Sequence, residues 1–141
     1  MCIIVDANVA NDISNLTEDG KPVVQWALKG GGAIIIGGKL KKELYLTKIR
    51  TTLVILSQAG RLHNLDDEKV SELTEKIKKS KICCSDDPHV IAAILLSKCR
   101  LIFTRDKKLH KDAKNLKIVN PAASIYSSRT HKRLLTKCEC V

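Results

Sequence analysis

The chain has 141 residues, 44% of them hydrophobic, which matches one globular domain with a single core. Only 3% of the residues are aromatic, so a sheet that stacks RNA bases on aromatic rings is not expected. The 25 Lys and Arg outnumber the 15 Asp and Glu and give a formal net charge of +10. This charge favours a polyanionic partner such as nucleic acid, but a basic surface that only keeps the protein in solution explains it equally well.

Targeting and membrane signals are not found. The first apolar run, residues 3–5, ends at Asp6 without a cleavage site, and the longest apolar stretch, 90–96, is far shorter than the about 20 residues that span a bilayer. The cysteine pairs at 83–84 and at 138 and 140 lack the spacing of a zinc knuckle. We therefore expect a cytoplasmic protein with no membrane anchor and no zinc site.

The first third of the chain contains two short, uninterrupted apolar runs, residues 2–5 and 33–36. Such runs are typical of strands that are buried on both faces of a parallel sheet. Residues 8–15 can begin a helix, and a further helix is predicted over 23–29, before three glycines. Helical composition then extends over residues 39–58.

The middle of the chain continues the alternation. Residues 61–65 can be extended, and a surface helix over 66–79 has acids at its start and lysines at its end, which complements the helix dipole. Residues 82–84 are predicted as the third strand. The helix that Pro88 opens is apolar nearly all round through residue 96, so it should be buried.

The last third is predicted to contain a fourth strand over 101–104, a helix over 107–114 and a fifth strand over 116–119. The alternation of strands and helices indicates an α/β fold with a largely parallel sheet. We expect the domain to comprise residues 1–126 and a basic C-terminal tail to comprise 127–141. The tail can be a phosphate-contacting arm or a frayed terminus, and its composition fits both.

Acidic residues follow several of the predicted strands. Asp6, the adjacent pair Asp86 and Asp87, and Asp106 each come after an apolar run, and Glu43 lies early in the helix after the second strand. Ligands bind beyond the carboxyl ends of strands in open parallel sheets. Carboxylates gathered there raise each other's pKa unless a cation compensates, and a hard divalent cation such as Mg²⁺ prefers oxygen ligands. The pattern predicts a metal site.

Each acid also has a structural explanation. Asp6 can simply end a strand, Glu43 can be a solvated charge paired with Lys39, Asp87 before a proline is a good helix N-cap, and Asp106 can be a turn residue. The joint placement of these acids, not any one of them, favours a site.

Four segments together resemble the PIN-domain family. They are IIVDAN (residues 3–8), LKKEL (40–44), SDDPHVIAA (85–93) and FTRDKKL (103–109). The third, with small and apolar residues along the helix that follows, is the most specific. The resemblance extends from the first residues to about the fifth predicted strand.

The resemblance implies a three-layer α/β/α sandwich with a central, mostly parallel five-stranded sheet. It also implies Mg²⁺- or Mn²⁺-dependent cleavage of single-stranded or structured RNA, frequently by a homodimer. By motif position, Asp6, Glu43, Asp87 and Asp106 match the four acids of the family, and Asp6, Asp87 and Asp106 are the expected metal ligands. The implied chemistry is attack of a metal-activated water on phosphorus, without a covalent intermediate.

Other residues are assigned less directly. The residues expected to contact substrate are Asn8, Thr104, Arg105, Lys107 and Lys108. The third acid is ambiguous by one residue, because Asp86 precedes Asp87, and Asp112 is a candidate additional acid.

The predicted function is that of an endoribonuclease hydrolysing RNA phosphodiester bonds, either as a toxin held by an antitoxin protein or in RNA processing. The alternative is a catalytically inactive PIN-like module that binds RNA or acts as a scaffold. A phosphoacceptor receiver domain fits less well, because it needs paired acids after its first strand, whereas the pair here follows the predicted third strand.

Overall fold

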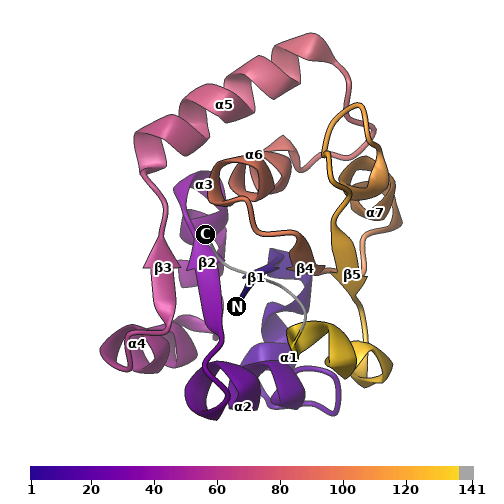
Figure 1. Ribbon diagram of the computed structural model, residues 1–141. Coiled ribbons are helices and arrows are strands. Elements are labelled where there is room, and N and C mark those ends of the chain that lie inside the picture. The colour runs from indigo at the N-terminus through magenta and orange to yellow at the C-terminus, as the bar shows by residue number, and fades with distance from the viewer. Residues whose placement is uncertain (137–141) are drawn as a thin grey trace.

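The structure, a computed structural model, describes residues 1–136 and contains a five-stranded sheet in the order β3-β2-β1-β4-β5 with every pair parallel (Figure 1). The strands are β1 (Cys2–Val5), β2 (Ala33–Ile36), β3 (Leu62–Asn64), β4 (Leu101–Phe103) and β5 (Ser124–Tyr126). The helices are η1 (Ala7–Val9), α1 (Ala10–Ser14), α2 (Lys21–Lys29), α3 (Gly38–Tyr45), α4 (Arg50–Gln58), α5 (Asp67–Ser80), α6 (Pro88–Ser97), α7 (Lys107–Lys114) and η2 (Arg129–Thr136). The predicted α/β/α fold with a parallel five-stranded sheet is confirmed.

The centre of the sheet is aliphatic, as the sequence predicts. Every residue of β1 and β2 is buried, and β1 pairs with β2 on one side and β4 on the other. A strand covered on both faces needs such uninterrupted apolar residues. The outermost strand, β3, carries partly or fully exposed side chains instead.

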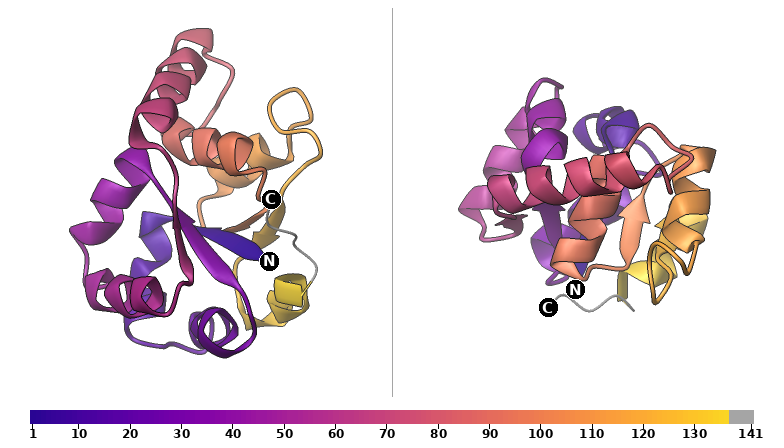
Figure 2. Two further views of the ribbon diagram at one scale, coloured as in Figure 1. Left: turned by 60° about the vertical axis from the view of Figure 1, so that its left-hand side comes forward. Right: turned by 90° about the horizontal axis from the view of Figure 1, so that it is seen from above.

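The order of the strands creates a switch point between β1 and β4. The chain winds outward from β1 to β2 and β3, then returns through α5 and α6 to β4 on the other side of β1. Right-handed crossovers therefore put α1 and α6 on opposite faces of the sheet, as Figure 2 shows. The carboxyl ends of β1 and β4 lie side by side, because the Asp6 amide donates to the Phe103 carbonyl at 3.0 Å. Ligands of open α/β sheets bind at such a point.

Two predicted strands are wrong. Residues 82–84 form a loop, because Ile82 is 45% exposed and the Cys84 amide donates to the Asp112 carboxylate instead of to a neighbouring strand. Residues 116–119 form a turn around Asn115, whose carbonyl accepts from the amides of the residues three and four positions later. The strand beside β4 is β5, and β3 supplies the other missing strand.

The predicted continuous helix over 39–58 is also wrong, because it is divided into α3 and α4. Thr47 separates them. Its amide and its hydroxyl both donate to the Leu44 carbonyl, at 3.0 and 2.7 Å, and its Oγ1 accepts from the Ile49 amide at 3.3 Å. A threonine that bonds to nearby backbone groups competes with helix continuation.

Part of the segment expected as a tail packs against the domain. Leu135 of η2 is 3% exposed and belongs to the core, and the Arg129 amide donates to Asp19 Oδ1 at 2.9 Å. Residues 137–141 of the expected tail lie outside the described residues. Within residues 1–136, no helix is long and apolar enough to cross a membrane.

Candidate functional site

Thr104 organises the carboxyl ends of β1 and β4. Its buried hydroxyl donates to Asp6 Oδ2 at 2.8 Å and accepts from the Asp106 amide at 3.1 Å and from Asn8 Nδ2 at 3.4 Å. The second carboxylate oxygen of Asp6 accepts from the Ala7 amide at 2.7 Å. Two predicted acids and two predicted substrate residues, Asn8 and Thr104, are therefore held together by one hydroxyl.

Asp6 is 4% exposed, so its charge is poorly solvated. Burial raises the pKa of this carboxyl above its ordinary value of 3.8, while hydrogen bonds from Thr104 and from the Ala7 amide oppose the rise. The nearby Asp106 raises the pKa further. A cation at this position would remove both penalties.

Asp106 is the N-cap of α7. Its Oδ1 accepts from the amides of Lys108 and Leu109 at 2.9 and 3.3 Å, so the turn role considered from the sequence is real. The same carboxyl group is also close enough to that of Asp87 to raise its pKa. Capping fixes Asp106 without preventing it from taking part in the site.

Asp87 precedes α6, yet its side chain makes no capping hydrogen bond. Its carboxyl lies near Asp106, Asp6 and Glu43 instead. The pKa of Asp87 rises from 3.8 to about 7, first through burial, then through the charge of Asp6, the hydrogen bond with Asp106 and the charge of Glu43. Asp86 is exposed and is not among these neighbours. The structure thus brings Asp87, not Asp86, to the other acids.

Glu43 reaches the site from α3, and the start of that helix depends on Gly38. The φ of Gly38 is +55°, and a Cβ there would lie 2.6 Å from Val70 Cγ1, so the chain can turn this close to α5 only with glycine. The Gly38 amide donates to Asp67 Oδ1 at 2.8 Å. Five residues further along α3, Glu43 faces α6.

His89 is a residue of the site that the sequence interpretation missed. Its ring is 1% exposed, and its Nε2 lies 3.2 Å from Glu43 Oε2 and 3.9 Å from Asp87 Oδ1. Burial lowers the pKa of His89, and the charge of Glu43 opposes this. Its Nδ1 is buried without a hydrogen-bond partner among the described residues. The available signal was a lone polar residue in the otherwise apolar run of α6, two positions after Asp87.

Arg105 was expected to contact substrate, but its guanidinium is engaged within the protein. It forms an ion pair with Asp12, lies 2.9 Å from Asp19 Oδ2, and stacks 5.8 Å from the centre of the Phe103 ring. This network ties the segment after β4 to α1 and to the loop before α2. Lys107 and Lys108 are exposed on α7.

Asp112, the candidate additional acid, has a different position. It is 3% exposed, and its two carboxylate oxygens accept from the amides of Cys84 and Ser85, each at 2.9 Å. Burial alone would raise its pKa, but hydrogen bonds from these two residues lower it below 3.8. Asp112 therefore holds the loop that leads to Asp87.

Within residues 1–136, no group of three or more His, Cys, Asp and Glu side chains is arranged as a ready-made metal site. The raised pKa of Asp87 instead favours a proton on this carboxyl group near neutral pH. The chemistry of the donor set fits Mg²⁺ or Mn²⁺, because Asp6, Asp87 and Asp106 offer only carboxylate oxygens. A cation would compensate the charges of these carboxylates in place of that proton.

The raised pKa of Asp87 leads to a stability prediction for the metal-free protein. The pKa of Asp87 is 3.8 in the unfolded chain and about 7 in the folded protein. Its contribution to the free energy of unfolding is therefore full below pH 3.8 and is lost as the pH rises through 7. In EDTA at pH 8, the free energy of unfolding of Asp87→Asn should therefore be about 2 kcal/mol higher than that of wild type. At pH 4 the two free energies should be nearly equal.

Urea denaturation at the two pH values measures this difference. Asp86→Asn is the matched control, because it removes a neighbouring, exposed carboxylate. An Asp87→Asn gain that does not grow between pH 4 and pH 8 would contradict the crowding of the acids.

The fold and the site together describe a three-layer α/β/α domain with carboxyl groups collected at the switch point of its parallel sheet. No protein-family model matches the chain. No curated protein matches it.

Among solved structures, the chain is similar to a chain in the crystal structure of VapBC2 from Rickettsia felis bound to a DNA fragment from their promoter. The TM-score is 0.51 at 14% sequence identity, over 90% of this chain and 100% of that one. At this identity, the likeness is one of fold alone.

Proposed function

We propose that the protein is a metal-dependent nuclease of the PIN type that hydrolyses phosphodiester bonds in RNA. The observation that carries the proposal is the convergence of Asp6, Asp87 and Asp106 at one switch point, where Asp6 and Asp106 both raise the pKa of Asp87. These carboxyl groups come from three segments far apart in the chain. The basic composition, the four PIN-like segments and the fold shared with a chain of the VapBC2 structure support the same function.

The residues that would hold Mg²⁺ or Mn²⁺ are Asp6, Asp87 and Asp106. A bound ion of this kind polarises a phosphate oxygen and lowers the pKa of a water molecule. Thr104 orients Asp6 through its hydroxyl, and the capping bonds of α7 hold Asp106. Because the pKa of Asp87 is raised to about 7, this carboxyl group would have to lose a proton to serve as a ligand, so metal binding should release protons.

Glu43 is held at the edge of the cluster by two contacts. His89 Nε2 lies 3.2 Å from Glu43 Oε2, and Lys39 Nζ lies 3.9 Å from Glu43 Oε1. With Nε2 protonated, the neutral imidazole donates to the carboxylate and fixes its direction. In this position Glu43 can accept a proton from water at the site.

Two biological settings fit this function. The crystal structure that shares the fold is of VapBC2 with promoter DNA, which fits a toxin held by an antitoxin protein. RNA processing is the other setting, and a homodimer and a cytoplasmic location are compatible with both.

One observation favours the second candidate, a catalytically inactive module that binds RNA or acts as a scaffold. The described residues offer no ready-made metal group, and Glu43 is engaged by His89. The purified protein should therefore be incubated with labelled RNA and DNA of the same sequence in Mn²⁺, Mg²⁺ and EDTA. Cleavage of RNA in either metal and none in EDTA is expected of the nuclease, whereas intact RNA under all conditions would leave the inactive module.

A metal-binding prediction separates the two candidates without relying on turnover. Wild type should bind Mn²⁺, and Asp6→Asn should bind it at least about tenfold more weakly, because one anionic ligand is lost. Isothermal titration calorimetry in two buffers of different ionisation enthalpy measures both the affinity and the protons released.

Asp86→Asn is again the matched control, since it removes the same charge from an exposed position. Equal Mn²⁺ affinity for Asp6→Asn and wild type would remove Asp6 from the metal site.

A further inference from the structure

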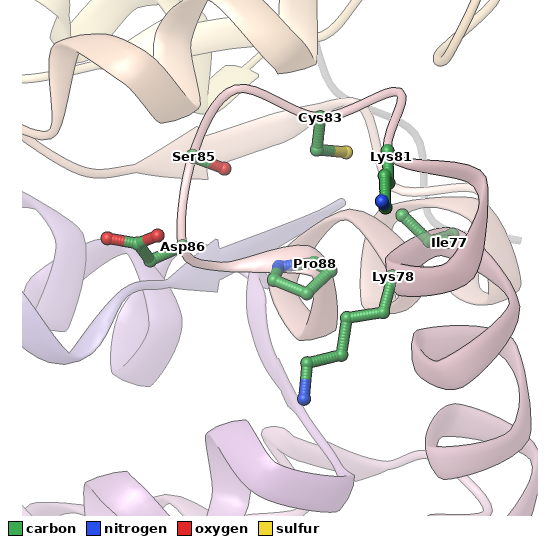
Figure 3. Close-up of a pocket in the computed structure, with 7 residues that line it drawn as sticks. All are labelled: Ile77, Lys78, Lys81, Cys83, Ser85, Asp86 and Pro88. Carbon is green, nitrogen blue, oxygen red and sulfur yellow. The ribbon is translucent and has the colours of Figure 1, made fainter.

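Two cavities lie next to each other between α5 and the start of α6. The first, of about 270 Å³, is lined by residues that include Lys78, Lys81 and Asp86, and Figure 3 shows it. The second, of about 170 Å³, is lined by residues that include Lys39, Glu75 and His89. The two cavities share Lys78, Asp86 and Pro88, so they are adjacent, and we call them together the α5–α6 groove.

The α5–α6 groove reaches two residues that contact Glu43, and none of the acids of the proposed active site lines either cavity. Lys39 and His89 line its inner end, and they are the two residues that contact the carboxylate of Glu43, at 3.9 and 3.2 Å. A strand lying in the groove would therefore lead to the cluster of acids.

The lysines of the groove are available to a ligand. Lys78 and Lys81 are exposed, and within residues 1–136 neither has a carboxylate oxygen within 4.0 Å. In Figure 3 the carboxylate of Asp86 points away from both ammonium groups. Unpaired ammonium groups along a groove fit a ligand with repeated negative charges, such as a phosphate backbone.

The lining residues also indicate which parts of a nucleic acid the groove would contact. In the described part of the chain, no Phe, Tyr or Trp lines either cavity. Stacking of bases on aromatic rings is thus absent from the groove, so its contacts would be to phosphates and independent of base sequence.

A second basic cavity, of about 480 Å³, is lined by Lys21, Arg129 and Lys132, but it fits the same ligand less well. Its Glu18 lies 3.7 Å from Arg129 Nη1, whereas Glu75 and Asp86, the acids of the α5–α6 groove, form no ion pair with Lys78 or Lys81 within residues 1–136. None of its lining residues belongs to the proposed active site or contacts Glu43.

We propose that the α5–α6 groove binds the sugar-phosphate backbone of single-stranded nucleic acid next to the scissile phosphate, with Lys78 as its central cation. This inference rests on the proposed function, because only a nuclease site at the acids gives the bound nucleic acid strand a scissile phosphate to lead to. It adds the path by which substrate reaches the acids.

The matched pair Lys78→Ala and Lys79→Ala tests the proposal. Both residues are exposed in the last turn of α5, and both changes remove one charge, but Lys79 does not line the groove. Binding of a labelled 12-nucleotide oligouridine is measured by fluorescence anisotropy in EDTA at several salt concentrations, and thermal melts verify the fold.

Lys78→Ala should weaken binding about three- to tenfold at low salt and lower the slope of log K against log salt by about 0.7, the value of one lost phosphate contact on a single strand. Lys79→Ala should change affinity less than about twofold. A heteropolymeric oligonucleotide should give the same ratio. Lys78→Glu should weaken binding more than Lys78→Ala, and Lys21→Ala should resemble Lys79→Ala.

Equal losses for the Lys78 and Lys79 variants, or no binding by wild type, would overturn the groove. Stronger competition by an acidic peptide than by unlabelled oligouridine would also overturn it, in favour of a protein partner. Because binding is measured without metal, the two proposals fail separately. If wild type cleaves RNA and the Lys78 and Lys79 variants lose equal binding affinity, only the groove proposal is rejected. If only the Lys78 variant loses affinity and wild type does not cleave RNA, only the nuclease proposal is rejected.

Discussion

Replacing Asp106 with Asn is expected to reduce RNA cleavage at least about 100-fold while the protein still folds and binds RNA. In the proposed site the change removes one anionic metal ligand, and a ligand's contribution of several kcal/mol to the stability of the transition state corresponds to losses of this size. Asn caps a helix about as well as Asp, so the bonds from the amides of Lys108 and Leu109 can persist. RNA affinity should persist because basic residues supply most of the attraction to phosphate.

A cleavage time course in Mn²⁺, beside a filter-binding curve at fixed salt, measures both effects. Glu68→Gln is the control, because Glu68 is exposed and lines neither cavity of the α5–α6 groove, and this variant should cleave at nearly the wild-type rate. Near-wild-type cleavage by Asp106→Asn would leave this residue with its capping role only.

Replacing Asp112 with Ala is expected to lower the free energy of unfolding by about 2–4 kcal/mol. The carboxylate accepts from the amides of Cys84 and Ser85 at 2.9 Å each, and the change leaves these donors without an acceptor. Cleavage should fall as well, because the loop that Asp112 holds leads to Asp87. Urea denaturation and a cleavage assay on the same samples measure the two effects.

Asp66→Ala is a matched control for Asp112→Ala. Asp66 also accepts from two backbone amides, at 3.0 and 3.1 Å, but it caps α5 on the surface, so its loss should cost about 0.5–2 kcal/mol without affecting cleavage. The pKa of Asp112 lies below 3.8, so its contribution is full above pH 3.8 and is lost as the pH falls through the lower folded value. A gap between wild type and Asp112→Ala that stays constant into strong acid would contradict the role of the carboxylate.

The local sequence pattern was sufficient to predict the inner strands of the sheet and several helices. The aliphatic runs of β1 and β2 are where the sequence predicts them, and so is α5, with acids at its start and lysines at its end. The two wrong strands were short apolar runs. Residues 116–119 turn around the neighbouring Asn115 carbonyl, whereas residues 82–84 depend on a distant partner. Asp112, 28 residues away, takes the backbone donor of Cys84 that a strand would use.

Asp6 and Asp106 could be placed at the edge of the sheet because each follows a buried strand, whereas Asp87 follows a loop that the sequence predicted as a strand. The partners of the acids could not be predicted. The contact of Glu43 with His89 joins residues 46 positions apart, and the bonds of Arg105 with Asp12 and Asp19 span 93 and 86 positions. Pairing over such separations is set by tertiary packing, so the sequence predicted Arg105 as a substrate residue where the structure engages it internally.

Asp19 connects the beginning of the chain to its last described segment. Its side chain accepts from Arg105 and from the Arg129 amide, and its carbonyl accepts from the Tyr126 hydroxyl at 2.7 Å. The chain leaves the ribosome from its N-terminus. Asp19 holds Arg105, which is the neighbour of Asp106. The set of hydrogen bonds to Asp19 is thus complete only after residue 129 has emerged, when every acid of the site has already been synthesised.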